Sequence, residues 1–203
     1  MTRTVKKPAE RRLEITETAQ RLFLDKGYES TSLNDVIAEL GVAKGTVYHY
    51  FKSKEELLDA VVQHMSTQYL KSIESKVSND TGDAVHKLKN LTQNMNVSEQ
   101  WKGKIQKLHL SSNMGLHVRL LGSLVRGLAP IMAAIIEQGC EEGVFNTLYP
   151  LEAAELLLSG LQFITDTGVY PWTEAELTRR VSAFPAIAEA QLGAKQGSLD
   201  FLM

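Results

Sequence analysis

Apolar residues recur at helical spacing along most of the chain. Near its start Ala19 is followed by Leu22 three residues later and by Phe23 four residues later, which places them on one face of a helix. Gly27 then stands where a glycine typically ends a helix. No segment shows the sustained alternation of apolar and polar residues that is typical of a strand. The pattern therefore predicts an all-α protein whose first helix spans about residues 9–26.

Polar residues at regular offsets mark where further helices begin. A serine or threonine followed three residues later by an acidic residue can form a capping box, in which the two side chains satisfy free backbone N–H groups. Three such pairs are present: Ser32 with Asp35, Ser53 with Glu56, and Thr173 with Glu176. With the apolar spacing they predict helices at about 33–40, 44–50, 54–77, 84–97, 99–111, 116–140, 150–167 and 173–192.

Glycine and proline supply the expected helix ends. The expected stops are Gly41, Gly139 with Gly143, Pro150, and Gly168 with Pro171. Pro130 lies inside the helix expected at 116–140 and should kink it, because proline removes a backbone donor and clashes with the preceding turn. Residues 193–203 show too little pattern to predict an element.

Two short helices separated by a three-residue turn fall within residues 31–58. The turn, Gly41 to Ala43, contains the glycine typical of a helix-turn-helix, whose second helix enters the major groove of DNA. Leu40, Val42 and Val47 can lock the two helices at a fixed angle, and Phe51 is expected to lie in the core. The second helix then projects donor and aromatic side chains: Lys44, Thr46, Tyr48, His49 and Tyr50.

Charge is unevenly distributed along the chain. The formal net charge is −2, yet residues 1–54 hold 10 lysines and arginines against 7 acidic residues, while the remaining chain holds 12 against 17. A basic front on an acidic body suggests a polyanionic partner at that end. Arg3, Lys6 and Lys7 are candidates for an arm that enters the minor groove, and a disordered, solubilising tail explains them equally well.

Composition excludes several other classes of protein. A chain with 43% hydrophobic and 23% charged residues, 14 glycines and 5 prolines is not collagen-like, low-complexity or wholly disordered. The longest unbroken apolar run, residues 128–136, contains Pro130 and is far shorter than a membrane span, so we expect no membrane contact. The basic start is not followed by an apolar signal region, and Cys140 is the single cysteine. Together these features predict a reducing, cytoplasmic location.

Motifs for catalysis and metal binding are missing from the sequence. GxSxG, P-loop, GxGxxG and HExxH patterns do not occur, and Cys140 stands beside two glutamates, where a reactive thiol needs positive charge. The five histidines include no pair four residues apart. His109 and His117 can share a pocket if the chain breaks between them, although satisfied or partly exposed histidines are the favoured interpretation. We therefore expect no catalytic residue, no metal and no cofactor.

Two stretches of sequence carry a resemblance to a known family. They are AQRLFLDKGYESTS at 19–32 and VIAELGVAKGTVYHYFKSKEELL at 36–58, and EQGCEEGVF at 137–145 adds weaker support. In these residues the chain resembles the TetR family of bacterial transcriptional regulators. The resemblance implies an N-terminal arm and three-helix, helix-turn-helix DNA-binding domain at 1–54, a connecting helix at 55–78, and a helical ligand-binding and dimerisation domain at 79–203.

The resemblance also implies which residues contact DNA. By their matching positions, some lie on the recognition helix and approach bases and phosphates: Lys44, Gly45, Thr46, Tyr48 and His49. Others touch the phosphate backbone: Thr31, Ser32, Tyr50, Lys52 and Lys54. For Tyr48 the hydroxyl and basic neighbours favour a contact with the DNA backbone over a place in the core. His49 is equally explained as an exposed histidine without a role.

Apolar faces in the second half predict a dimer interface and a ligand pocket. The last two helices present faces suited to an intersubunit four-helix seam, through Leu157, Leu161, Phe184, Ile187 and Ala188. Packing within one chain is the alternative. A pocket for a small hydrophobic ligand is expected from Trp101, Leu108, His109, Asn113, Met114, His117, Leu120, Leu124 and Phe163. An ordinary helical core has the same composition.

By this resemblance the expected function is that of a ligand-responsive transcriptional regulator, most simply a repressor. It would bind a palindromic double-stranded operator as a homodimer, respond to an unknown small hydrophobic effector, and lie in the bacterial cytoplasm in association with the nucleoid. The alternative is an architectural DNA-binding protein without an effector. A ligand-sequestering or catalytic helical protein is a third interpretation.

Overall fold

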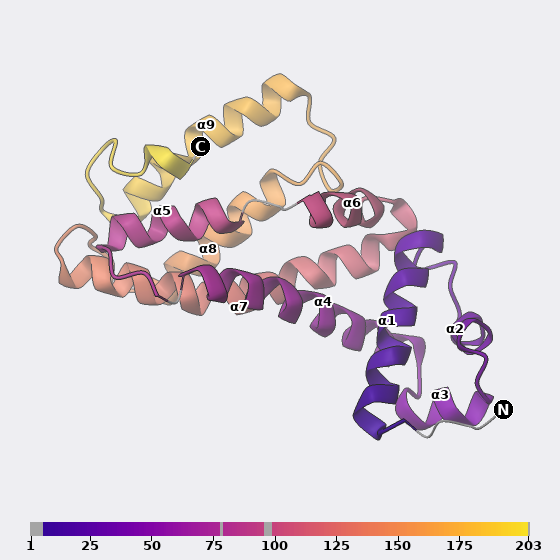
Figure 1. Cartoon of the computed structure of the whole chain (residues 1–203). Helices are drawn as coiled ribbons and strands as arrows, with labels where there is room; N and C mark the ends of the chain where they lie inside the picture. The colour runs from indigo at the N-terminus through magenta and orange to yellow at the C-terminus, as the bar shows by residue number, and fades with distance from the viewer. Residues whose placement is uncertain (1–5, 78, 96–98, 203) are drawn as a thin grey trace. The chain divides into compact units, whose positions relative to one another are not determined.

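The computed structural model describes residues 6–77, 79–95 and 99–202, and the side chains of residues 99–102 fall outside that description. Every regular element in these ranges is helical, which confirms the predicted all-α class. The α-helices, shown in Figure 1, are α1 (Pro8–Lys26), α2 (Leu33–Leu40), α3 (Lys44–Tyr50), α4 (Lys54–Val77), α5 (Ala84–Met95), α6 (Glu99–Leu108), α7 (Met114–Glu141), α8 (Pro150–Ile164) and α9 (Glu174–Leu192). Two 3-10 helices are η1 (Ser111–Asn113) and η2 (Asp200–Leu202).

Side-chain caps fix the starts of several helices as the sequence predicts. The boxes that begin at Ser32 and Thr173 both form. At the start of α4 the Ser53 hydroxyl accepts a hydrogen bond from the Glu56 N–H at 3.1 Å. The Glu56 carboxylate accepts from the backbone N–H of Lys52 at 2.7 Å, one residue earlier than in a standard box. The cap therefore also holds the connection between α3 and α4.

Two helices end three residues earlier than expected, α6 at Leu108 and α8 at Ile164, whereas α7 ends at Glu141, close to the expected residue 140. Helix α7 continues through Pro130 and past Gly139 to Glu141, and the chain turns at Gly143, whose φ of +73° suits glycine. Gly139 serves packing, because a Cβ at that position would lie 2.1 Å from the Phe145 ring. The residue is small so that the chain after the turn can fold back closely on α7.

Packing divides the chain into two compact units. Unit 1 consists of residues 1–65 and 103–120, and unit 2 of residues 66–102 and 121–203. The division between residues 65 and 66 falls inside α4, the helix that is expected to connect the two domains. It differs from the expected domains in one respect, because residues 103–120 pack with the N-terminal helices instead of the rest of the helical body.

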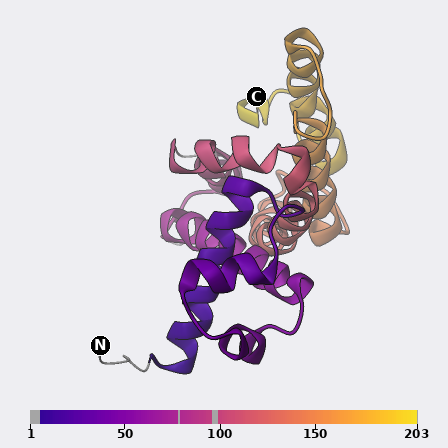
Figure 2. The same cartoon turned by 90° about the vertical axis from the view of Figure 1, so that its right-hand side faces the viewer.

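The core of unit 1 joins its first helices through fully buried side chains. These residues, each at most 1% exposed, are Ile15, Phe23, Val36, Val47, Phe51 and Leu57. Burying each such side chain stabilises the fold by about 1.5–3 kcal/mol. Helices α1 and α2 pack together, as do α2 and α3, and Figures 1 and 2 show the three as one group. An ion pair between Arg21 and Glu39 adds a surface link between α1 and α2.

The turn at η1 docks on the connection between α1 and α2. Asn113 is fully buried, and its Oδ1 accepts a hydrogen bond from the Tyr28 N–H at 2.7 Å. Its Nδ2 donates to the Lys107 carbonyl at 2.9 Å. The Ser112 carbonyl accepts from the Glu29 N–H at 3.0 Å. Residues far apart in the sequence are therefore fixed together by hydrogen bonds, of which the one between Asn113 and Tyr28 is buried.

Unit 2 is built on a separate apolar core. Its fully buried members come from α5, α7, α8, α9 and the C-terminal segment: Leu91, Ile136, Ala154, Leu192 and Leu199. The C-terminal segment, for which the sequence predicts no element, is held by Glu189, whose carboxylate accepts from the Leu199 N–H at 2.9 Å. Burial raises the pKa of Tyr69 to about 12, which keeps the phenol protonated as a donor to the Met95 carbonyl at 2.8 Å.

Helix α7 and the preceding turn are unusually apolar. Over 18 residues their mean hydropathy reaches 1.6, and by length and composition alone residues 111–141 suffice to cross a membrane. Half of the 18-residue window is buried inside the protein. Such burial is typical of the core helix of a globular protein.

Replacing Asn113 by alanine should lower the free energy of unfolding by about 1–3 kcal/mol, because the buried Tyr28 N–H and Lys107 carbonyl each lose a partner. Urea denaturation followed by circular dichroism measures the change. Gln106→Ala, an exposed amide truncation on α6, is the matched control and should stay close to the wild type. Equal stability of the two variants would contradict the structural role assigned to Asn113.

Candidate nucleic-acid interface

Helix α3 is held against the core by one buried side chain on the helix and one just after it. Val47 and Phe51 are both fully buried, four residues apart, so they lie on the same face. The Arg12 guanidinium lies 4.7 Å from the centre of the Phe51 ring, which adds a cation–π contact from α1. A seven-residue helix does not persist alone in water, so this anchoring fixes its position.

The opposite face of α3 is polar and accessible. Lys44, Gly45 and His49 are exposed, and Thr46, Tyr48 and Tyr50 are partly exposed. The Lys44 ammonium lies 5.3 Å from the centre of the Tyr48 ring. The rings of His49 and Tyr50 meet edge to face at 5.0 Å. The residues expected on a recognition helix are therefore all at least partly accessible, and together they carry a cation, hydroxyls and imidazole nitrogens.

Thr31 corrects the expected set of DNA contacts. Its side chain is 2% exposed, and the hydroxyl donates to the Gly27 carbonyl at 2.8 Å. The threonine thus closes the end of α1, and its side chain is not accessible to a phosphate. Ser32 is exposed, but its hydroxyl and N–H both bind the Asp35 carboxylate, which keeps the pKa of Asp35 below its ordinary value. A phosphate would have to compete with that carboxylate for Ser32.

Two lysines flank the helix-turn-helix with their ammonium groups on backbone carbonyls. Lys52 donates from Nζ to the Tyr48 carbonyl at 2.8 Å, near the C-terminal end of α3, where a cation is favourable. Lys54 donates to the Glu29 carbonyl at 3.2 Å, and its Nζ lies 4.2 Å from the Tyr28 ring centre. The partners of both ammonium groups are uncharged, so no acidic group neutralises the two positive charges in these contacts.

The basic arm carries less free charge than its sequence suggests. Lys6 and Arg11 both bind the Glu14 carboxylate at 2.7 Å. The hydrogen bond from Lys6 holds the pKa of Glu14 below its ordinary value. Arg3, the first residue of the expected arm, lies outside the described residues, and Lys7 is exposed.

The expected dimer residues divide into two groups. Leu157 and Ala188 are buried in the core of unit 2, at 6% and 0% exposure, so their assignment to an intersubunit surface is wrong. Each of the two side chains lies on the face of its helix that packs into this core. Leu161, Phe184 and Ile187 instead line an open apolar groove between α8 and α9, in which Ile187 is 57% exposed. Sequence reasoning missed the most exposed leucine of α8, Leu156.

The expected ligand residues do not line the cavity that unit 2 contains. That cavity has a volume of about 30 Å³ and an apolar wall that includes Leu88, Met132 and Leu158. Among the expected residues, Leu108, Asn113 and Leu120 are buried in unit 1, with the amide of Asn113 fully bonded, so it is wrong as a ligand contact. Met114 is exposed, Leu124 and Phe163 are half-buried, and the side chain of Trp101 lies outside the described residues.

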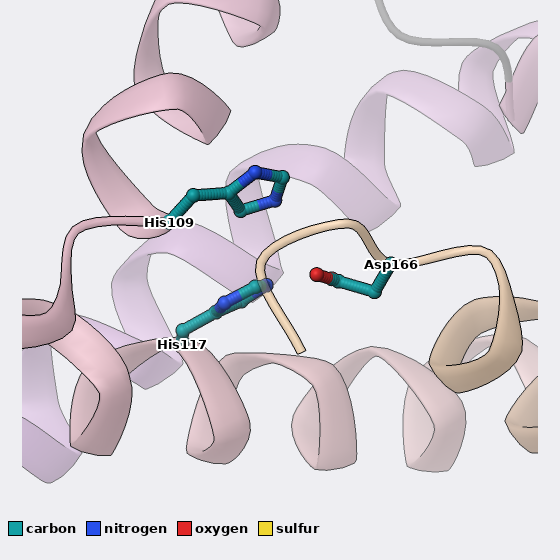
Figure 3. Close-up of side chains that lie close together, drawn as sticks. All are labelled: His109, His117 and Asp166. Atoms are coloured by element: carbon teal, nitrogen blue, oxygen red, sulfur yellow. The ribbon is translucent and has the colours of Figure 1, made fainter. Parts of the chain in front are cut away.

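Two histidines meet where the chain breaks between α6 and α7. His109 follows the last residue of α6 and His117 lies on the first turn of α7, and their ring centres are 5.1 Å apart with planes tilted by 31°. Figure 3 shows the two rings beside each other. The break at residues 109–113 produces this pair, as the spacing of eight residues allows. Asp166, also labelled there, belongs to unit 2 and accepts hydrogen bonds from the N–H groups of Gly168 and Val169.

The matches to protein families agree with this architecture. Residues 15–61 match the bacterial regulatory proteins of the tetR family, and residues 94–187 match a tetracyclin repressor-like C-terminal domain. Together the two matches cover more than half of the sequence. The chain belongs to the TetR family, a class of bacterial regulatory proteins with a helix-turn-helix.

Individual relatives extend the comparison. The HTH-type transcriptional repressor KstR2 of Mycolicibacterium smegmatis is 37% identical over 60 residues, which span 30% of this chain and 29% of that repressor. A TetR-family transcriptional regulator from Syntrophomonas wolfei has a TM-score of 0.65 at 23% identity, covering 90% of this chain and 96% of the other. The SmeT–triclosan complex has a TM-score of 0.60 at 22% identity, covering 93% and 94%. The structural matches show the same fold over almost the whole chain.

Replacing Gly45 by alanine should test whether α3 is a regular helix with room for a side chain at this position. No atom lies within 4 Å of the position a Cβ would take, so alanine fits there and should raise the free energy of unfolding by up to about 1 kcal/mol through its higher helix propensity. The control Gly41→Ala also meets no neighbour, but its φ of +61° strains an alanine, so stability should fall. Thermal unfolding measures both changes. If Gly45→Ala lost as much stability as Gly41→Ala, α3 would not be the regular helix described.

Proposed function

We propose that the chain is a ligand-responsive DNA-binding regulator that represses transcription by occupying a palindromic operator as a homodimer. The observation that carries this proposal is the polar face of α3, held outward by the burial of Val47 and Phe51. Its lysine and hydroxyl groups suit phosphates and base edges. A role on DNA places the chain with bacterial DNA in the cytoplasm. The named repressor KstR2, similar over the N-terminal region, supports repression.

A homodimer would explain the apolar groove between α8 and α9. Ile187, Phe184 and Leu161 line it, and large exposed apolar side chains in such a groove favour a protein partner. Two copies joined there would form a four-helix seam. Two recognition helices about 34–36 Å apart then fit successive major grooves, so that a palindrome is read twice.

An effector would act through the helical body. The cavity in unit 2 has room for about two water molecules, so a ligand of ordinary size must widen it. Its apolar wall favours a small hydrophobic molecule, and the similar protein SmeT was solved in complex with triclosan. Helix α4 contributes residues to both units, and a shift along it is the simplest link between effector and DNA. Moving the population from 1:99 to 99:1 takes a preference of about 5.5 kcal/mol.

Lys44→Ala and Tyr48→Phe should each weaken operator binding by about 1–3 kcal/mol while leaving the fold intact, because each removes a group proposed to contact DNA and neither residue is buried. Fluorescence anisotropy with a selected DNA palindrome at fixed salt gives the affinities. Lys71→Ala removes an equal charge from an exposed position on α4 outside unit 1 and is the control. Unchanged affinity in both α3 variants would remove α3 as the reading element. Strong binding without a preferred palindrome would favour an architectural role.

Ile187→Glu should convert a dimer to monomers and abolish tight binding to a palindrome, since a carboxylate buried in an apolar seam without a partner costs several kcal/mol. Ile187 is more than half exposed in the single chain, so the folded monomer should tolerate the change. Light scattering alongside the DNA titration measures both effects. The matched control is Leu156→Glu, at a position 66% exposed on α8 outside the groove. A dimeric Ile187→Glu variant with full affinity would place the dimer interface elsewhere.

A further inference from the structure

We propose that His109 and His117 form a binding site for a late first-row transition-metal ion such as Zn²⁺ or Cu²⁺, and that the bound ion stiffens the segment between α6 and α7. Figure 3 shows the two imidazole rings that would hold the ion. This goes beyond the proposed function, and only its effect on DNA affinity rests on that function.

The distance between the rings is close to what a shared ion needs. A ring nitrogen of His109 and one of His117 lie within 4.8 Å of each other. Two nitrogens on one tetrahedral ion, each about 2.0–2.1 Å from the metal, are about 3.3 Å apart. His117 is 3% exposed and fixed on the first turn of α7, whereas His109 follows the end of α6 and is half-buried. The half-buried His109, just after the end of a helix, is therefore the side chain that would move to close the remaining distance.

The chemistry of the pair selects the class of ion. Neutral imidazole nitrogens bind Zn²⁺, Cu²⁺ and Ni²⁺, whereas Mg²⁺ and Ca²⁺ prefer oxygen ligands. The basic residues nearest in sequence do not oppose a cation, because Lys107 binds Asp25 at 2.6 Å and Arg119 binds Asp59. The positive charges of Lys107 and Arg119 are therefore each paired with a carboxylate. Two protein ligands leave positions on the ion for water.

Because of where the two histidines lie, a bound ion would restrict the movement of η1. His109 and His117 flank η1, whose Ser112 and Asn113 bind the Glu29 and Tyr28 N–H groups. An ion held by both histidines closes a short loop around η1 and lowers its conformational freedom. Because the ion would bind the folded loop and not the unfolded chain, it would stabilise unit 1. A firmer η1 would also hold the α1–α2 connection that positions α2 and α3.

The test uses the full-length, untagged chain, stripped of metal with a chelator. Zn²⁺ is titrated in competition with a colorimetric chelator, and thermal unfolding is followed with and without Zn²⁺. We expect about one ion per chain and a higher melting temperature. His109→Gln and His117→Gln should each weaken binding by about tenfold or more, since each removes one of two ligands. Mg²⁺ should have no effect.

Two control variants exclude other zinc ligands. His86→Gln changes an exposed histidine of unit 2, and Cys140→Ser removes the single thiol, and both should bind Zn²⁺ like the wild type. Circular dichroism checks the fold of each variant, and the half-buried His109 keeps the test decisive if His117→Gln fails to fold. Undiminished binding in His109→Gln, loss of binding in either control, or no binding by the wild type at moderate zinc excess would overturn the site.

The effect on DNA is measured separately. Operator affinity is compared with and without Zn²⁺ in the wild type and in His109→Gln, and we expect a change in the wild type alone. Metal binding is measured without DNA, so it stands or fails independently of the proposed function. Zinc binding at the pair with identical operator affinity in both states would overturn the regulatory part of the proposal.

Discussion

A single buried amide, the side chain of Asn113, connects the two parts of unit 1 that are most distant in sequence. The end of α1 leaves the Tyr28 N–H without a helical partner, and no water reaches it. An amide can accept that hydrogen bond and donate to the Lys107 carbonyl at the same time, which no apolar or singly functional side chain can do. The chain leads from that connection into α2 and α3, so Asn113 helps to hold the segment from which both helices start.

Close packing reinforces that hydrogen bond. Gly27 has a φ of +94°, and a Cβ on it would lie 2.3 Å from the Ser112 hydroxyl. The residue therefore needs glycine for its backbone conformation and for the approach of η1. Val47 and Phe51 provide the corresponding restraint on α3, whose accessible face can vary in sequence without changing the fold. The buried residues of α3 and its C-terminal end thus serve stability, and the accessible residues are the ones proposed to read DNA.

The sequence predicts where the helices of this fold lie better than it predicts which residues they contact. Helix positions follow from apolar periodicity and from capping pairs such as Ser32 with Asp35, since these signals act within a few residues. Thr31 is expected at the DNA from the family resemblance, and Asn113 at the ligand pocket as a polar residue among apolar ones, but both side chains bind backbone groups instead. Only contacts with residues distant in the sequence distinguish those roles. Such contacts cannot be identified from the residues themselves.

The face of a helix is similarly hard to predict. Successive residues are about 100° apart around the axis, so Leu156 is exposed while Leu157 lies in the core. In a helix with three consecutive leucines the apolar pattern does not determine which of them faces outward. The role of Gly139 is also hard to predict from the local sequence. Its close approach to Phe145 arises from packing after the turn at Gly143.

The carboxylate shared by Lys6 and Arg11 has a consequence for the salt dependence of any polyanion complex. Each lysine or arginine that newly neutralises a phosphate releases counterions, and the number released sets how steeply affinity falls with salt. A cation already paired with Glu14 releases fewer, because the polyanion exchanges one carboxylate for one phosphate. The slope should therefore be shallower than a count of basic residues implies, and binding at this end of the chain should remain less sensitive to changes in cellular ionic strength.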